Sequence, residues 1–404
     1  MIKSQRLLRQ AEQLIPLCAQ TFSKSPSWFV KGVYPTYLQG GLNGHVWDVD
    51  GNEYIDFIMG LGAVSLGYCH PAVDAAIKNQ LSEGINFSLP HPLEIELAEL
   101  LHRIIPCADM VRFAKNGTDV TTAAVRLARL WTHREKVVYS GYHGGGSDWY
   151  GITTDRSGGI PKILKNYIYS FEYNDLNSLE RLFNQYPDIA CVIMEPTIFT
   201  HPEEGFLERV KEITHHEGAL LIFDEMVTGF RMRISGAQGL FRVIPDLATF
   251  GKGIANGMPL STLVGKREIM SRAGEIFFSY TFAGECLSLA AGIATIKEMQ
   301  NGAIDKIWKL GRELICGLEK LGLRVIGYPC RFHVVLPDEN QRSLFMQELL
   351  KRGILVHSSG YNICATHTES DIDRAIAAHK DALTAMASGA RLEGLPIQPT
   401  FRRF

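Results

Sequence analysis

The chain has no dominant charge of one sign. Its 41 lysine and arginine residues are balanced by 43 aspartate and glutamate residues, giving a formal net charge of −2. Such a chain has no basic field to attract nucleic acid, so no nucleic-acid partner is predicted. It also has no apolar run of membrane-spanning length and no apolar signal-peptide core near the N-terminus. We therefore expect a cytoplasmic protein with no membrane partner.

Closely spaced cysteine patterns are missing as well. The eight cysteines are scattered, with no C-x-x-C pair and no cysteine–histidine cluster of zinc spacing. This favours free thiols in a reducing compartment and predicts no metal site. Apolar residues make up 46% and charged residues 21% of the chain, as in an ordinary soluble protein. A length of 404 residues exceeds one ordinary core and suggests two or more lobes.

Three regions differ in their secondary-structure pattern. Residues 1–59 combine a helix with short strands and are expected to join the small lobe. Residues 60–297 alternate short apolar strands with helices, which predicts an α/β domain with a mostly parallel central sheet between helices. Residues 298–404 are expected to form a small α/β lobe, whose last helix begins near Ser370 in a Ser-x-x-Asp capping box. The strands expected in the large domain are 111–113, 137–140, 190–194, 220–224 and 247–250, and those in the small lobe are 324–326 and 333–336.

An acid and a lysine follow two of these strands. The apolar run 220–223 ends at Asp224, and Lys252 lies between glycines just after the run 247–250. Both are expected at the carboxyl edge of the sheet, where open α/β folds bind ligands. A pyridoxal phosphate (PLP) enzyme requires such a pair, because the lysine forms a Schiff base and the carboxylate keeps the pyridine nitrogen protonated. Taken alone, the two residues are more often a surface acid and a solvated loop lysine.

Two glycine-containing turns supply further residues that could contact PLP. Gly117 and Thr118 open a helix after the strand 111–113, and their N–H groups and hydroxyl suit a phosphate. An ordinary capped helix has the same pattern. Tyr142 and His143 stand among glycines at the end of the strand 137–140, which suits stacking on a flat heteroaromatic ring. A flexible loop with an incidental aromatic residue is the alternative.

The order of these motifs resembles that of the class III PLP-dependent aminotransferases of fold type I, in the branch similar to glutamate-1-semialdehyde 2,1-aminomutase. The series is Asn-Gly-Thr, Tyr-His-Gly, Met-Glu-Pro, Asp-Glu-Met-Val-Thr-Gly-Phe-Arg and Gly-Lys-Gly. The resemblance covers nearly the whole chain, from residue 47 to residue 373. It implies the PLP-dependent transferase fold, with a large PLP-binding domain and a small α/β lobe, and PLP as the cofactor.

Carried over position by position, the resemblance assigns catalytic roles to Lys252 as the Schiff-base lysine and to Asp224 as the partner of the pyridine nitrogen. Thr281 matches the threonine that reaches the cofactor phosphate of the partner subunit, which implies a homodimer with shared active sites. The remaining cofactor contacts that it implies are Gly117 and Thr118 at the phosphate, Tyr142 and Met226 on the two ring faces, His143 in the Tyr-His-Gly motif, and Glu195 as a buried acid near the cofactor.

Several positions depart from the aminomutase pattern. The segment 21–29 lacks the arginine that holds the substrate carboxylate in those enzymes. Trp149, in a shortened loop, suits a flat or ring-shaped substrate or belongs to a packed aromatic pair. Tyr361, a further candidate substrate residue, lies in a run that replaces the aminomutase's acidic residue. Glu285 could accept hydrogen bonds from sugar hydroxyls, or it is a helix N-terminal glutamate favoured by the helix dipole.

These features predict a PLP-dependent aminotransferase. It would move an amino group from an amino-acid donor such as glutamate to an aldehyde or ketone derived from a sugar or polyol, in a surface-polysaccharide or natural-product pathway. True glutamate-1-semialdehyde 2,1-aminomutase activity is the main alternative. A PLP-dependent lyase and a catalytically silent protein of the PLP fold are two further alternatives, since the cofactor motifs do not select the reaction.

Overall fold

The protein folds into two compact units. The structure, a computed structural model, describes residues 2–398. Unit 1 is formed by the chain up to His70 together with the chain from Asp305 onward, and unit 2 is formed by the continuous stretch Pro71–Ile304. No helix among the described residues is long and apolar enough to cross a membrane.

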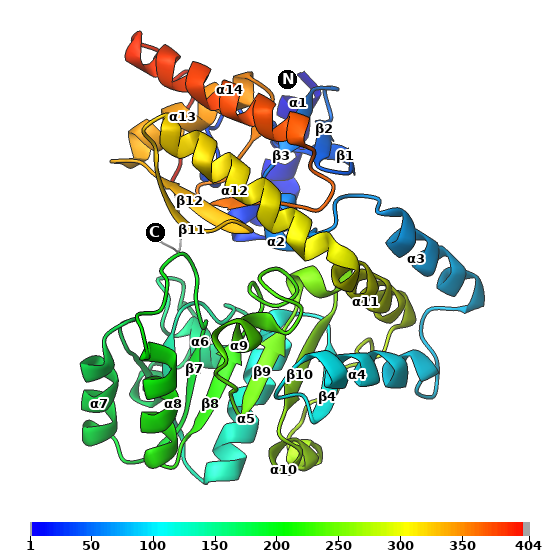
Figure 1. Ribbon diagram of the computed structural model, residues 1–404, viewed down its shortest axis with the longest axis vertical. Helices are drawn as coiled ribbons and strands as arrows, with labels where there is room; N and C mark the ends of the chain where they lie inside the picture. The colour runs from blue at the N-terminus through cyan, green and yellow to red at the C-terminus, as the bar shows by residue number, and fades with distance from the viewer. Residues whose placement is uncertain (1, 399–404) are drawn as a thin grey trace. The chain divides into compact units, whose positions relative to one another are not determined.

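A seven-stranded sheet forms the centre of unit 2 (Figure 1). Five strands run parallel, from β9 through β8, β7 and β5 to β6, and β10 runs antiparallel between β9 and β4. The predicted fold class, α/β with a mostly parallel central sheet, is confirmed. The strands are β4 Met110–Ala114, β5 Lys136–Ser140, β6 Ile168–Ser170, β7 Ile189–Met194, β8 Leu220–Asp224, β9 Leu247–Phe250 and β10 Ser261–Gly265.

Helices cover both faces of this sheet. The helix α5 packs against β7 to β10, whereas α8 packs against β8 and α7 packs against α8. Figure 1 shows α7 and α8 beside the β7–β8 half of the sheet. The helices of unit 2 are α3 Pro71–Glu83, α4 Pro92–Ile104, α5 Gly117–Thr132, α6 Asp148–Gly151, α7 Leu176–Gln185, α8 Phe206–His216, α9 Gly236–Phe241, α10 Arg267–Met270 and α11 Cys286–Glu298.

Alternation along β8 fixes the face to which its terminal acid belongs. Leu220 and Ile222 are buried in one apolar cluster with Val120 and Ala124 of α5. Because successive side chains of a strand point to opposite faces, Asp224 lies on the same face as Leu220 and Ile222. The last residue of β8 is therefore directed to the α5 side of the sheet.

Unit 1 contains two smaller sheets. One has the order β1-β2-β3-β13 and the other the order β11-β12-β14. Its strands are β1 Leu38–Leu42, β2 His45–Asp48, β3 Glu53–Asp56, β11 Arg324–Tyr328, β12 Arg331–Val335, β13 Ile354–Leu355 and β14 Tyr361–Asn362, and its main helices are α1 Ile2–Leu14, α12 Ile304–Lys320, α13 Glu339–Lys351 and α14 Glu369–Ala387.

The last helix, α14, begins at Glu369, close to the expected Ser370, but the expected capping residues were wrong. The N-cap residue of α14 is Thr368, whose hydroxyl accepts from the N–H of Asp371, and the Asp371 carboxylate accepts from the Thr368 N–H in return. Thr-x-x-Asp therefore forms the capping box in place of the predicted Ser370-x-x-Asp373. Thr368-x-x-Asp371 and Ser370-x-x-Asp373 overlap and are of the same type, so the sequence alone does not show which of them forms the capping box.

Candidate active site

Asp224 ends β8 as a buried carboxylate. Asp224 is only 2% exposed to solvent. One oxygen, Oδ2, lies 2.8 Å from His143 Nδ1. The other oxygen, Oδ1, accepts from the Met226 N–H at 3.1 Å and from the Thr249 hydroxyl at 3.3 Å. A buried carboxylate is retained in a protein interior only with such partners, so its position and orientation are fixed by the surrounding chain.

His143 joins this acid to the end of a neighbouring strand. Its Nε2 lies 3.2 Å from the carbonyl oxygen of Ser140, the last residue of β5. A carbonyl oxygen only accepts, so Nε2 is the donor of this contact and Nδ1 faces the Asp224 carboxylate. The Thr121 hydroxyl in α5 in turn donates to the His143 carbonyl oxygen at 3.0 Å. The imidazole therefore holds the Asp224 carboxylate in place from inside the fold.

The thioether of Met226 lies between the start of α5 and the residue before Lys252. A Cβ atom added to Gly117, the first residue of α5, would lie 3.0 Å from Met226 Sδ. A Cβ atom on Gly251 would lie 2.6 Å from the same sulfur. Glycine at both positions therefore allows the backbone at Gly117 and the backbone at Gly251, just before Lys252, to pack against the Met226 side chain.

Thr118 contacts the glycine-rich loop that follows β5. Its Oγ1 accepts from the Gly146 N–H at 3.4 Å. A Cβ atom on Gly144, whose φ is +86°, would lie only 2.4 Å from that hydroxyl. The close approach and the positive φ both require glycine at residue 144. The loop is thereby held against the N-terminal turn of α5.

Glu195 supports the other end of the same loop. Its Oε2 accepts from the Tyr142 N–H at 2.8 Å, and a Cβ atom on Gly141 would lie 2.7 Å from that oxygen. Glu195 is itself buried and follows β7 directly. The acid after β7 thus fixes the backbone that carries Tyr142.

Lys252 begins a short helical turn after β9. The residue is half-buried and has a φ of +43°, in the left-handed region that a lysine rarely adopts. Backbone strain of this kind costs about 1–3 kcal/mol and is concentrated at functional sites. The strain marks Lys252 independently of its sequence motif.

The structure thus brings eight of the nine predicted cofactor-site residues into one connected region of unit 2. They are Gly117, Thr118, Tyr142, His143, Glu195, Asp224, Met226 and Lys252. Thr281, the ninth, lies exposed on the segment between β10 and α11.

Thr249 is a partner of Asp224 that the sequence did not identify. It lies opposite Asp224 in the parallel pairing of β8 and β9. The predicted strands contained both residues, but strand register depends on tertiary packing and cannot be read from either run alone. The only indication in the sequence was the Thr249 hydroxyl inside the otherwise apolar run 247–250.

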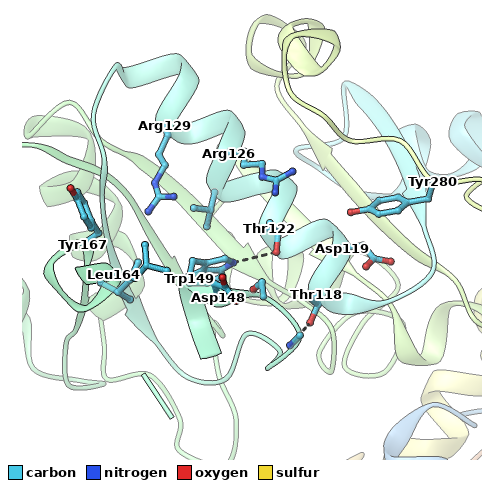
Figure 2. Close-up of a pocket in the computed structure, with 14 residues that line it drawn as sticks. Thr118, Asp119, Thr122, Arg126, Arg129, Asp148, Trp149, Leu164, Tyr167 and Tyr280 are labelled. Atoms are coloured by element: carbon cyan, nitrogen blue, oxygen red, sulfur yellow. Dashed lines mark hydrogen bonds between the residues drawn. The ribbon is translucent and has the colours of Figure 1, made fainter. Parts of the chain in front are cut away.

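Trp149 is buried beside the loop and lines a pocket of about 430 Å³ along α5 (Figure 2). Its indole N–H donates to the Thr122 hydroxyl at 3.3 Å, and its ring stacks on His143 with centroids 6.1 Å apart. Figure 2 shows Arg126 and Arg129 further along the same helix. The contacts of Trp149 are those of a packed aromatic residue that supports His143.

Tyr361 belongs to the core of unit 1. Its hydroxyl lies 2.9 Å from His379 Nε2, and its ring stacks on Phe332 with centroids 5.0 Å apart. The side chain is buried. These contacts account for Tyr361 by packing, and they leave its proposed contact with substrate without support.

Glu285 is the N-cap residue of α11. Its carboxylate accepts from the N–H groups of Leu287 and Ser288, from the Ser288 hydroxyl at 2.6 Å and from Lys115 Nζ at 2.7 Å. Burial raises the pKa of this carboxyl, but the hydrogen bonds from Lys115 and Ser288 outweigh it and lower the pKa overall. Both oxygens are engaged, which favours the helix-capping interpretation over a sugar contact.

We expect Glu285→Gln to lower the free energy of unfolding by about 1–3 kcal/mol, because it leaves the Lys115 ammonium without its charge partner in a site where both side chains are mostly shielded. Since the folded-state pKa is lowered, this stabilisation is present at neutral pH and is lost as the pH falls below the ordinary value of 4.5. Denaturant unfolding at several pH values measures both effects.

Glu275→Gln is the matched control for this prediction. Glu275 pairs with Arg272 at 2.8 Å on the surface of the same unit, where removal of the pair should leave stability nearly unchanged. Unaltered stability of Glu285→Gln together with a raised KM for a hydroxylated acceptor would instead favour the sugar contact.

A buried carboxylate at the sheet edge, a lysine beyond the next strand, and glycines packed around one thioether fit PLP, whose ring nitrogen, aldehyde and phosphate need such groups. The fold and this residue set define a PLP-dependent enzyme of fold type I. The family model described as Aminotransferase class-III matches residues 31–380, and the chain belongs to this family. The cofactor is PLP.

Curated relatives cover almost the whole chain. A glutamate-1-semialdehyde 2,1-aminomutase of Desulforamulus reducens is 33% identical over 95% of this chain and 98% of its own length. A 3-aminobutyryl-CoA aminotransferase of Cloacimonas acidaminovorans is 35% identical, with 94% and 96% covered. Among solved structures, the FumI protein of a Sphingopyxis species in its PLP internal aldimine form is 27% identical, with a TM-score of 0.89 and 99% of both chains covered.

Proposed function

We propose that this enzyme transfers an amino group from an amino-acid donor, with glutamate as the predicted one, to an aldehyde or ketone. The single observation that carries the proposal is the connected set of contacts from Asp224 through Met226 to Gly251, the residue directly before Lys252. Bound PLP supplies an electron sink for such chemistry. The residues of the chain hold the cofactor, orient it and move protons.

Lys252 carries two roles in this proposal. Its amine would hold the cofactor covalently and would move a proton at the donor's α-carbon. Asp224 keeps a proton on the ring nitrogen, and His143 keeps Asp224 in place.

The remaining predicted residues hold the cofactor in this proposal. Gly117 and Thr118 offer the phosphate the N-terminal turn of α5, whose N–H groups and dipole favour an anion. Tyr142 stacks on one ring face, and Met226 covers the other. Glu195 acts indirectly, because its carboxylate accepts a hydrogen bond from the Tyr142 N–H and so positions Tyr142.

The acceptor is proposed to be a hydroxylated carbonyl compound derived from a sugar or polyol. The support is the absence of an arginine from residues 21–29. In the aminomutases an arginine there holds the substrate carboxylate, so an acceptor with a carboxylate would lack that charge partner here. Glu285 no longer adds to this support, since its oxygens are engaged within the protein. The surface-polysaccharide or natural-product pathway stays a prediction.

Glutamate-1-semialdehyde 2,1-aminomutase activity is the second candidate, favoured by the names of relatives from Desulforamulus reducens and Brevibacillus brevis. The two functions differ in their need for a donor, because a mutase moves the amino group within one bound molecule. We expect poor conversion of glutamate-1-semialdehyde to 5-aminolevulinate and better amination of a hydroxylated aldehyde when glutamate is supplied. Loss of one charged hydrogen bond corresponds to about a ten- to hundredfold weaker affinity for the semialdehyde. Efficient 5-aminolevulinate formation without added donor would establish the mutase instead.

The proposal includes a homodimer with shared active sites. Unit 2 exposes large apolar side chains near Thr281, with Phe277 85% and Phe282 60% exposed. The N–H of Cys286 donates to the Ile85 carbonyl oxygen, which joins this segment to a second one that exposes Phe87 and Leu89. Monomeric proteins rarely expose contiguous apolar surface of this kind, so a second copy of the chain is the proposed occupant.

We expect Phe282→Asp to weaken the dimer at least about tenfold, because it places a charge in the apolar interface. Light scattering over a dilution series measures this. Ile244→Asp is the matched control, since Ile244 is also exposed, at 42%, but lies before β9, away from this segment in the sequence. Thr281→Ala should keep the dimer and retain PLP less well during dialysis. A fully active monomer would rule out shared sites.

A further inference from the structure

Tyr150 lies at the centre of an aromatic cluster beside the proposed cofactor residues. It belongs to α6, is 7% exposed and packs in the apolar cluster that contains Val120 and Ile222. Its ring contacts four neighbouring rings at centroid distances of 5.4–5.6 Å and interplanar angles of 68–89°. Edge-to-face contacts of this kind are favourable and directional. The four neighbours are Tyr139, Tyr142, His143 and Trp149.

Two of these neighbours are proposed cofactor residues with different tasks. The Tyr142 ring, proposed to stack on the cofactor, lies 5.4 Å from the Tyr150 ring at an angle of 89°. The His143 ring, which holds the Asp224 carboxylate, lies 5.5 Å from the Tyr150 ring at 80°. One side chain therefore packs against the residue proposed for a face of the cofactor ring and against the residue that supports Asp224. A rotation of either ring would disturb its contact with Tyr150.

The Tyr150 hydroxyl binds the peptide group that precedes Tyr142. It donates to the Gly141 carbonyl oxygen at 3.1 Å, whereas Glu195 accepts from the Tyr142 N–H at 2.8 Å. This carbonyl and this N–H belong to one planar peptide group, so both of its polar ends have partners. The plane from which the Tyr142 side chain extends is thereby fixed by one side chain at each end.

The same hydrogen bond closes the loop 141–150 on its first residue. The middle of the loop is held separately, because the Gly146 N–H donates to Thr118. The loop thus contacts the residue proposed for the cofactor phosphate, and it carries the residues proposed for a ring face and for the support of Asp224. Loss of the Tyr150 side chain would release the loop at one of these points.

We propose that Tyr150 is a positioning residue for the cofactor. It acts through Tyr142 and His143, whose rings it orients, and not by contact with the reacting atoms. A residue that only filled the core could be replaced by another apolar side chain, whereas this role requires a ring and a hydroxyl in the same place. The inference rests on the proposed function in one respect, because it takes Tyr142 and His143 as residues of the cofactor site.

Titration of the cofactor-stripped, full-length protein with PLP tests the proposal. We expect Tyr150→Leu, which removes the ring and the hydroxyl, to raise the Kd for PLP at least about tenfold. Tyr150→Phe keeps the ring and loses only the hydrogen bond to Gly141, so its Kd should rise about two- to fivefold. The same titrations in Lys252→Ala measure these effects without the covalent link. Amino transfer is no part of these measurements, so a wild type that transfers no amino group would contradict the proposed function and leave this test intact.

Circular dichroism in the visible band of the bound cofactor reports its orientation, which a purely structural role of Tyr150 would not alter. Per mole of bound PLP, the ellipticity of Tyr150→Leu should fall at least about twofold, because the Tyr142 ring is no longer held against the cofactor. Tyr150→Phe should keep most of the wild-type ellipticity. Measurements at saturating PLP separate this change of orientation from the change of affinity.

Tyr169→Leu is the matched control. The Tyr169 ring stacks on Tyr186 with centroids 4.1 Å apart, and its hydroxyl donates to the Asn166 carbonyl oxygen at 2.7 Å. It thus loses the same two kinds of contact on β6, and both readouts should stay at their wild-type values. Wild-type affinity and ellipticity in Tyr150→Leu, or equal losses in Tyr169→Leu, would overturn the proposal. Should Tyr150→Leu fail to fold, wild-type affinity in Tyr150→Phe would overturn it instead.

Discussion

Lys252→Ala should abolish the covalently bound cofactor and reduce turnover by several orders of magnitude while the protein remains folded. The variant has no amine at the turn that directly follows β9, so it has neither the group that would link the cofactor nor the base at the donor's α-carbon. The visible absorbance of the lysine-bound cofactor, the mass of the borohydride-reduced protein and the steady-state rate measure the three consequences.

Lys297→Ala is the control for this variant. Lys297 lies on α11 in the same unit and pairs with Glu96 on the surface at 3.3 Å, so its loss should change none of the three readouts. Lys252→Arg should behave like Lys252→Ala, since a guanidinium keeps the charge but does not form the imine. A Lys252→Ala protein that still carries an imine-linked cofactor would show that another lysine fills the role.

Asp224→Asn should still bind PLP and lose at least about a hundredfold in rate, the order expected when a positioned proton partner is removed. A neutral amide matches the shape of the carboxylate but does not hold the proton on the pyridine nitrogen. It also places an amide opposite His143 Nδ1, which in the wild type lies 2.8 Å from a carboxylate oxygen. Rate measurements at saturating donor and a cofactor titration separate the loss of catalysis from the loss of binding.

Thr249→Val offers a milder change at the same carboxylate. It removes only the hydrogen bond at 3.3 Å to Asp224 Oδ1 and keeps the side-chain shape. Its rate should lie between those of wild type and Asp224→Asn. Near wild-type turnover by Asp224→Asn would remove Asp224 from the mechanism.

The sequence predicted the parts of unit 2 that follow from local pattern. The apolar runs that became β8 and β9 were bounded correctly to the residue, because a strand buried on both faces needs a continuous apolar stretch that a polar residue ends. Two strands were not predicted. β6 has only three residues, and β10 follows the Lys252 turn without a pattern that distinguishes an antiparallel strand from the loop around it.

Single-residue roles were harder to predict than motifs. Glu285 and Tyr361 were predicted as substrate contacts, whereas the fold engages them with Lys115, 170 residues away along the chain, and His379, 18 residues away. The hydrogen-bond partners of a side chain depend on tertiary contacts, which cannot be predicted from the residues near it in the sequence. By contrast, the residues around Asp224 lie at strand ends and helix starts, which topology alone brings to one edge of a sheet.

Unit 1 cannot be completed until late in synthesis, because the chain order places its two halves at opposite ends. β3 needs β13 as its parallel neighbour, and Ile55 pairs with Ile354, about 300 residues later. At about 5–20 residues per second the ribosome takes roughly 15–60 s to bridge that interval. Unit 2 is synthesised within this interval and is complete before Ile354 is added, while one edge of β3 stays unpaired and open to other nascent chains. Slow translation would therefore lengthen the time for which this edge of the N-terminal segment is exposed.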